Sequence, residues 1–248
     1  MKRIVAITAL AIAGASIPAA AQVNGLPLFN NPMGTNGVAF GGLAGFPDED
    51  FGSGATAAGY LGLGNGMLSA TLLGGVRSPG EDRDSFGVFG ANAALRLLGG
   101  NGIPVNLNLQ GGVGIETNNE VPFLPNDIGD RSTRNYTGSV GLGLNLGNER
   151  NGVQPWVSGG VRMVDFDVEG LQNSTNFGFS AGADVLLPAG FMLRGAVDFT
   201  QVDFSLEDPD FGDIDIPTSS EDVAVFAFGF GWNFHMPSMG SSGETSRR

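Results

Sequence analysis

The chain lacks cysteine altogether and contains one histidine, His235, and one lysine, Lys2. Without cysteine it can form neither a disulfide nor a thiolate-based metal or redox site. Because the only lysine is the second residue, no phosphate-binding sequence of the form GxxxxGK[ST] is present. Positive charge is scarce as well, with 12 Lys and Arg against 25 Asp and Glu. This acidic balance argues against nucleic acid as a partner, since phosphates need a basic face.

The N-terminus carries the pattern of an export signal. Lys2 and Arg3 are followed by an uncharged apolar stretch over 4–17 and by the small residues Ala19–Ala21. This pattern predicts a secretory signal peptide over 1–21 that is removed after Ala21. A buried or membrane-anchoring helix is the alternative, but the stretch is short for a membrane span. We therefore expect an exported protein that is stabilised by its core or by lipid rather than by disulfides.

Glycine, with 42 copies, has no three-residue period, which excludes a collagen-like chain. The glycines lie instead in stretches where apolar and polar residues alternate, as in GIPVNLNLQGGVGIE over 102–116 and again over 135–146 and 176–187. A period of two predicts strands with one apolar and one polar face. Globular strands usually have about five or six residues. These stretches are longer and could cross a bilayer at a tilt, which takes roughly nine to eleven residues.

The whole chain read in this way predicts an all-β fold of about ten strands, with eight as the alternative. The uncharged stretch 54–76 could also be a transmembrane helix. Its seven glycines disfavour a helix, at about 1 kcal/mol each relative to alanine, and Asn65-Gly66 is a strong hairpin signal. The predicted strands are 37–45, 54–63, 67–77, 86–98, 103–116, 133–146, 153–165, 174–187, 191–204 and 223–235.

The connections between these strands alternate in length and charge. Those at 64–66, 99–102, 147–152 and 188–190 are short. The others, at 46–53, 78–85, 117–132, 166–173 and 205–222, are longer on the whole and hold 18 of the 25 acidic residues, against two arginines. Short turns on one side and longer loops on the other are typical of a closed, antiparallel, up-and-down transmembrane β-barrel. A soluble β-sandwich has no evident reason to sort its loops in this way.

The last strand places five aromatic residues on one face. In VAVFAFGFGWNF, over 223–234, these are Phe226, Phe228, Phe230, Trp232 and Phe234. In water such a face is an aggregation hazard, whereas against lipid it is expected, with the last two residues in the interfacial girdle. The segment Gly229–Phe234 resembles the C-terminal assembly signal of small bacterial outer-membrane β-barrel proteins, the class of OmpA/OmpX-like and porin-like barrels. The resemblance implies recognition by the barrel assembly machinery. In that class the phenylalanine usually ends the chain, whereas here fourteen residues follow.

The stretch LLPAGFMLRGAVDF over 186–199 predicts the register of one hairpin. A three-residue loop at 188–190, with Gly190 in the left-handed position, makes Leu187 and Phe191 the closing pair. Asp184 then lies opposite Arg194, and Phe179 lies opposite Phe199. The charged side chains would line a polar interior, paired across strands, rather than lie in a dry core. The candidate lumen-lining residues are Arg96, Arg162, Asp184, Arg194 and Asp198.

Catalysis and specific metal binding have weaker support. Barrel enzymes resemble one another in using a histidine as base, and His235 lies at the end of the last strand, away from the acidic loops. We therefore expect no enzyme and no cofactor.

The loop EDPDFGDID carries five carboxylates that could bind Ca²⁺, but their spacing does not match an EF-hand. A solvated acidic loop is the alternative interpretation. These weak metal candidates are Glu207, Asp208, Asp210, Asp213 and Asp215.

The predicted organisation is a signal peptide (1–21), a polar periplasmic lead-in (22–36), an outer-membrane β-barrel (37–235) and a flexible tail (236–248). The expected role is structural or surface-facing, through acidic extracellular loops that contact divalent cations at the lipid surface. The alternative is a narrow porin-like channel for small solutes, because the polar face would wet a pore. Ten strands lie near the closed end of barrel sizes, since water-filled porins have about sixteen. A secreted β-sandwich adhesin is a third possibility.

Overall fold

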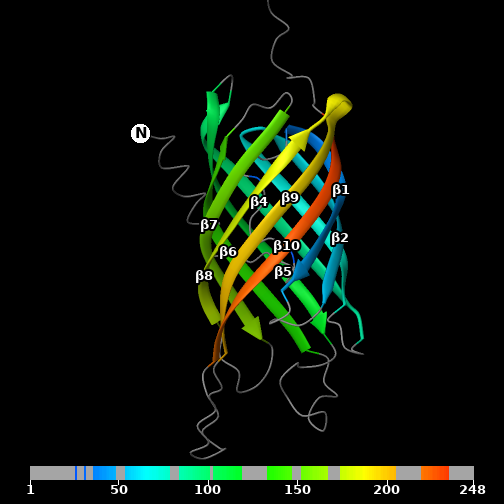
Figure 1. Cartoon of the computed structure of the whole chain (residues 1–248), viewed down its shortest axis with the longest axis vertical. Helices are drawn as coiled ribbons and strands as arrows, with labels where there is room; N and C mark the ends of the chain where they lie inside the picture. Colours follow the sequence, from blue (N-terminus) through cyan, green and yellow to red (C-terminus); the bar gives the residue numbers. More distant parts are fainter. Residues whose placement is uncertain are drawn as a thin grey trace, which may run out of the picture.

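The computed structural model describes Leu26, Asn31 and residues 36–48, 54–78, 84–100, 103–118, 133–146, 152–166, 174–204 and 219–234. These residues form one closed barrel in which each strand pairs antiparallel with its sequence neighbours, and the first strand pairs with the last (Figure 1). The predicted fold class is therefore confirmed, with ten strands rather than eight. Within the described part of the chain, no helix is long and apolar enough to cross a membrane.

The strands are 11 to 16 residues long, as the alternating pattern predicts. Most ends lie within a few residues of the predicted bounds. The largest difference is at the last strand, which begins at Ser219, so that Glu221 and Asp222 belong to the strand and not to the preceding loop. The strands are β1 (Asn36–Pro47), β2 (Ala55–Asn65), β3 (Leu68–Ser78), β4 (Phe86–Gly100), β5 (Ile103–Asn118), β6 (Thr133–Leu146), β7 (Gly152–Phe166), β8 (Ser174–Leu186), β9 (Phe191–Phe204) and β10 (Ser219–Phe234).

The turn between β2 and β3 follows from the Asn65-Gly66 pair. Gly66 adopts a φ of 79°, a left-handed conformation in which glycine carries no steric penalty. The side-chain oxygen of Asn65 accepts hydrogen bonds from the backbone N–H groups of Met67 (3.0 Å) and Leu68 (2.8 Å). Asparagine thus caps the turn locally, as it commonly does. The hairpin of β2 and β3 excludes the alternative of one transmembrane helix over 54–76.

The turn between β8 and β9 is the short 3₁₀ element η2 (Pro188–Gly190). The N–H of Leu187 donates to the carbonyl of Phe191 at 2.8 Å, so these two residues close the hairpin as predicted. Gly190 adopts the expected left-handed conformation, with a φ of 78°. Ala189 also has a positive φ, 63°, which the sequence did not reveal. The register places Asp184 opposite Arg194 and Phe179 opposite Phe199, which confirms the predicted pairing.

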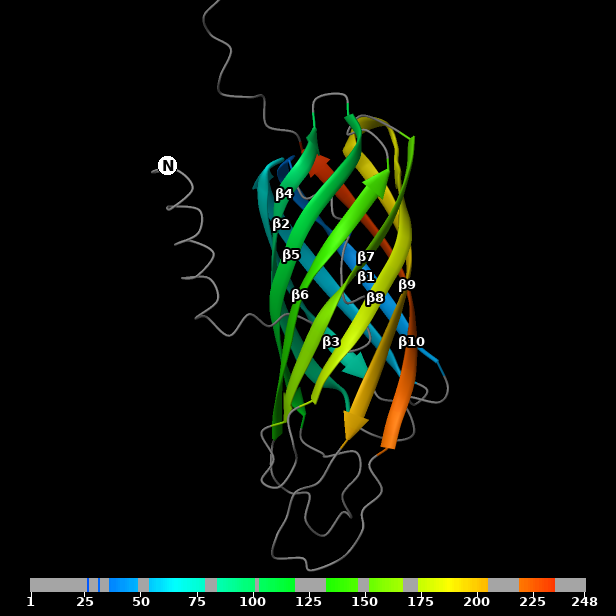
Figure 2. The same cartoon turned by 90° about the vertical axis from the view of Figure 1, so that its left-hand side faces the viewer.

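The two ends of the barrel differ in how their strands are joined. We call the end with the β2–β3 and β8–β9 turns the turn end; in Figure 2 the strands tilt from it to the opposite, loop end. The five sequence segments that join strands at the loop end, 48–54, 79–85, 119–132, 167–173 and 205–218, contain three, three, three, two and five acidic residues. Sixteen of the 25 acidic residues of the sequence therefore fall in the segments that connect strands at this end.

Candidate functional site

The outer surface of the barrel is apolar. Thirty-three large hydrophobic side chains among the described residues are exposed, including Phe177 (66%) and Phe228 (62%), whereas most of the buried side chains are polar. This arrangement is the reverse of that in a soluble protein, which rarely exposes large contiguous apolar patches. It is the arrangement of a transmembrane barrel, whose outward residues contact lipid.

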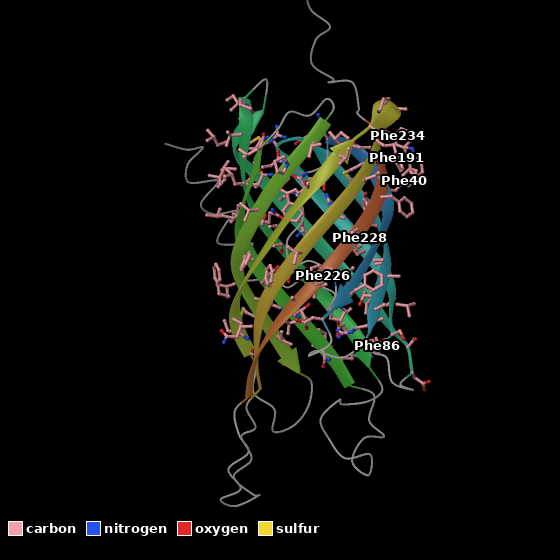
Figure 3. All side chains as sticks on the ribbon, in the orientation of Figure 1. Phe40, Phe86, Phe191, Phe226, Phe228 and Phe234 are labelled. Carbon is pink, nitrogen blue, oxygen red and sulfur yellow. The ribbon has the colours of Figure 1, made fainter. Side chains whose placement is uncertain are left out.

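Aromatic side chains gather on the outer face at the turn end, where β9, β10 and β1 meet. Figure 3 shows Phe40, Phe191 and Phe234 near this end, with Phe228 and Phe226 farther along β10. The ring of Trp232 lies 4.9 Å from that of Phe191 and 5.9 Å from that of Phe40, centroid to centroid. Phe40 also stacks on Phe234 at 5.8 Å. Such clusters at a membrane boundary form aromatic girdles.

The exposed apolar side chains of the outer surface form a lipid-facing belt. This belt can be tested on one strand, β6. Val140, outward-facing and 51% exposed, lies near the middle of β6. We expect Val140→Arg to lower the free energy of unfolding in vesicles by about 2–4 kcal/mol, because a charge at the bilayer midplane is costly. Urea titration followed by tryptophan fluorescence measures this loss.

The matched control for this substitution is Leu146→Arg, on the same face at the end of β6. Near the interface the same charge should cost only about 0–1 kcal/mol. Equal effects at the two positions would contradict a membrane belt. In a water-soluble barrel, an exposed Val→Arg change would alter stability by less than about 0.5 kcal/mol.

The inner surface of β5–β9 is polar and closed. The inward residues Gln110 (1% exposed), Thr137 (0%) and Ser180 (0%) lie on β5, β6 and β8, in the alternating positions expected of a lumen face. An open aqueous pore would leave such side chains accessible to water. The other buried polar residues of these strands are Asn106, Asn108, Glu116, Ser139, Asn145, Gln154, Ser158, Ser174, Asn176, Asp184, Asp198 and Thr200.

Asp184 lies at the centre of a cluster of polar side chains inside the barrel, near the turn end. Its carboxylate accepts two hydrogen bonds from Arg194, from Nε at 2.8 Å and from Nη2 at 2.7 Å. Trp156 Nε1 donates to the same carboxylate at 3.4 Å, and Asn31 Nδ2 donates at 2.8 Å. A two-pronged arginine–carboxylate pair of this kind combines charge with fixed geometry. Asp184 and Arg194 are therefore a buried ion pair that draws β7, β8 and β9 together.

A second polar cluster lies farther from the turn end, around Asp198. Ser180 Oγ and Thr200 Oγ1 donate to its carboxylate, the latter at 3.1 Å. Arg162, on β7, interacts electrostatically with both Asp198 and Glu116. Glu116 also approaches Arg77 of β3, with 3.9 Å between Oε1 and Nη1. Cations and carboxylates thus alternate around the lumen, which lowers the cost of burying each of them.

Glycines on β6 let side chains reach across a strand. Gln110 Nε2 of β5 donates to Ser158 Oγ of β7 at 3.3 Å, although β6 lies between these strands. The residues of β6 that face this bond are Gly141, the register partner of Gln110, and Gly143, the partner of Ser158. Larger side chains there would occupy the path of the bond. The small residues of the lumen face therefore make room for cross-links rather than for an open channel.

The inner surface of β10, β1, β2 and β4 is, by contrast, largely apolar. Val223, Val225 and Ala227 of β10 face inward and are buried. Leu26, Leu43, Ala58 and Val88 form a buried cluster, with Tyr60, Leu73 and Phe86 packed against it. The barrel interior thus has a polar half and an apolar half. The sequence pattern did not indicate this division.

The structure places all five candidate lumen residues on inward-facing positions, but not in one cluster. Asp184 pairs with Arg194, and Asp198 interacts with Arg162. Arg96 lies on β4, opposite Asn108 of β5. Sequence reasoning missed Asn31, Leu26, Trp156, Glu116 and Arg77. For Trp156 and Glu116 the alternating parity was available as a signal, whereas nothing in the sequence marks Leu26 or Asn31 as interior residues.

The metal candidates Glu207, Asp208, Asp210, Asp213 and Asp215 lie outside the described residues, as do His235, the predicted signal peptide (1–21) and the predicted tail (236–248). Among the residues that the structure describes, no group of three or more His, Cys, Asp or Glu side chains could hold a metal ion.

The lipid-facing belt, the aromatic girdle and the closed ten-stranded sheet together define a small barrel of the outer-membrane type. No family model matches the chain, and no curated protein matches it. Solved structures similar to it include the outer membrane protein OprG from Pseudomonas aeruginosa, with a TM-score of 0.37 and 14% identity over 83% of this chain and 100% of that one.

Two further similar structures are also barrels. The outer membrane protease OmpT from Escherichia coli has a TM-score of 0.38 and 12% identity, over 80% of this chain and 94% of that one. The N-terminal β-barrel domain of Pseudomonas aeruginosa OprF has a TM-score of 0.33 and 12% identity, over 80% of this chain and 99% of that one. At such identities the likeness concerns the fold alone.

Proposed function

We propose that this protein is a closed barrel of the outer membrane with a structural or surface-interaction role and no catalytic activity. One observation carries the proposal: the inward polar side chains of β5–β9 are sealed from solvent, as shown by the 0–1% exposure of Gln110, Gln154, Thr137 and Asp184. Gln110 bonds to Ser158 of another strand, and Asp184 bonds to Arg194 and Trp156. A lumen filled in this way supports a stable scaffold in lipid rather than steady solute flow.

The acidic segments at the loop end supply the proposed contact surface. In outer-membrane barrels the longer loops face outward and the short turns face the periplasm. The same orientation here would present the acidic residues of the five joining segments at the cell surface, after export through the signal peptide and its cleavage. Carboxylates at this density suit divalent cations. The partners that we propose are outer-membrane lipid, divalent cations bridging Glu207, Asp208, Asp210, Asp213 and Asp215 to anionic headgroups, and the barrel assembly machinery through Gly229–Phe234.

A narrow channel for small solutes is the second candidate function. It is favoured by the continuous polar wall of β5–β9 and by its alternating charges, Arg162, Asp198 and Glu116. Movement of these side chains would be needed to open a path.

Single-channel recording in a planar bilayer tests the proposed function. We expect the purified, detergent-refolded protein to insert without discrete conductance steps, because the lumen is filled by bonded side chains. Protection of the strands from protease shows insertion, and a heat-denatured sample is the control. Reproducible steps from the folded protein alone would contradict the closed barrel and favour the channel.

A further inference from the structure

The charged side chains that face the interior of the barrel carry an excess of positive charge. Among the strand residues whose side chains the structure describes, four arginines and three carboxylates face inward. They are Arg77, Arg96, Arg162, Arg194, Glu116, Asp184 and Asp198. The whole chain, by contrast, has a formal net charge of −13. The described interior is therefore a cationic region of an acidic protein.

The inward arginines are more accessible than the inward carboxylates. The side chains of Arg77 and Arg194 are 11% exposed, whereas those of their partners Glu116 and Asp184 are 2% exposed. Arg162 is half-buried. The carboxylates are thus packed into the wall and the guanidinium groups keep accessible surface. A small solute inside the barrel would meet positive charge first.

Arg162 has hydrogen-bond donors that the protein does not use. Its Nε is buried and has no hydrogen-bond partner in the described part of the chain. Asp198 and Glu116 act on its charge through space, but no ion pair joins either of them to Arg162 among the described residues. Arg194, by contrast, donates to Asp184 from both Nε and Nη2.

The two carboxylates near Arg162 have partners of their own. Asp198 accepts hydrogen bonds from Ser180 and Thr200, and Glu116 approaches Arg77. A buried guanidinium without acceptors is costly, because the hydrogen bonds that it makes in water are lost. An acceptor that enters from solution would remove part of this cost.

We propose that Arg162 binds a small monovalent carboxylate, of the size of formate or acetate, inside the barrel. The guanidinium is a planar fork of N–H donors and can bond to both oxygens of one carboxylate. Its register partners, Ser139 of β6 and Asn176 of β8, place polar side chains on either side. A divalent anion is disfavoured, because Asp198 and Glu116 would repel its second charge. Such binding goes beyond the proposed structural role and does not require a closed lumen.

Saturation-transfer NMR of acetate tests the proposed site directly. The sample is the full-length protein, refolded in deuterated detergent, with acetate as the probe. We expect saturation to pass from the folded barrel to the acetate methyl group, and formate to compete it away. Sulfate at the same ionic strength should not compete. Competition by sulfate equal to that by formate would overturn the assignment of a monovalent carboxylate.

Arg162→Gln removes the guanidinium and should weaken acetate binding about tenfold or more, the factor for hydrogen bonds to a charged group. The matched control is Arg134→Gln, which removes an exposed arginine near the start of β6 and should bind acetate as the wild type does. Arg162→Lys keeps the charge in the interior but not the fork. We expect it to weaken binding about fivefold, the equivalent of one hydrogen bond.

The outcomes separate this proposal from the proposed function. A folded wild type that transfers no saturation to acetate would overturn the anion site, and so would Arg162→Gln with wild-type binding; the closed barrel stands in both cases. Conductance steps from the wild type would contradict the closed barrel and leave the anion site intact. Folding is checked by the heat-dependent shift on a gel. If Arg162→Gln fails to fold, Arg162→Lys decides, and wild-type binding by that variant would overturn the site.

Discussion

Replacing Asp184 with alanine should lower the free energy of unfolding by about 3–5 kcal/mol, the range for removing one partner of a buried ion pair. Asp184 accepts bonds from Arg194, Trp156 and Asn31 inside the barrel. Its loss leaves the Arg194 guanidinium buried without its carboxylate. Urea unfolding in lipid vesicles, followed by tryptophan fluorescence, measures the effect.

Two variants control this prediction. The double change Asp184→Asn with Arg194→Gln removes both charges and should recover part of the stability, because no uncompensated charge is left. Asp165→Ala removes an exposed carboxylate near the end of β7 and should alter stability by less than about 0.5 kcal/mol. If Asp184→Ala is as mild as Asp165→Ala, the ion pair does not stabilise the barrel.

Replacing Gly41 with valine should prevent most of the protein from closing into a barrel. A Cβ at Gly41 would meet the carbonyl oxygen of Phe230, the Cα of Gly231 at 2.7 Å and the ring of Tyr60 at 2.8 Å. Extra methylenes that meet movable side chains already cost about 1–3 kcal/mol. Here two of the three neighbours are backbone atoms of β10, so the pairing of β1 with β10 must shift.

The matched control is Gly195→Val, on β9. A Cβ there meets nothing within 4 Å. Valine also favours strands over glycine, so this variant should fold at least as well as the wild type. The fraction of closed barrel is read from the heat-dependent mobility shift on a gel. Equal closed fractions for the two valine variants would show that close approach at Gly41 is unimportant.

Alternation of residue types sufficed to predict most of the fold. In β8 and β9 a three-residue turn sets the register, and a period of two then determines which residues face lipid. Phe179 stacks on Phe199 at 4.9 Å outside, and Asp184 pairs with Arg194 inside, as this reasoning requires. Both results follow from residues within one hairpin, where local sequence decides the partners.

Contacts between strands that are not neighbours in the sheet could not be predicted in this way. The Arg77–Glu116 approach joins β3 to β5, and the Gln110–Ser158 bond joins β5 to β7. Such contacts depend on the curvature and stagger of the closed sheet, which are properties of the whole barrel. The hydrogen bonds of Asn31 depend on this curvature and stagger as well, since its partners come from three strands.

The β1–β10 pairing has a consequence for the order of assembly. Every other pairing joins strands adjacent in the sequence, whereas the register Val38↔Phe234 joins residues almost 200 positions apart. The nine hairpins can form by local zippering, but the last pairing needs a long-range encounter, and non-local contacts of this kind slow folding. Until that encounter the sheet is an open ribbon with two unpaired edges, which are sites of unwanted association. The time this ribbon spends open sets the period in which misassembly competes with productive folding.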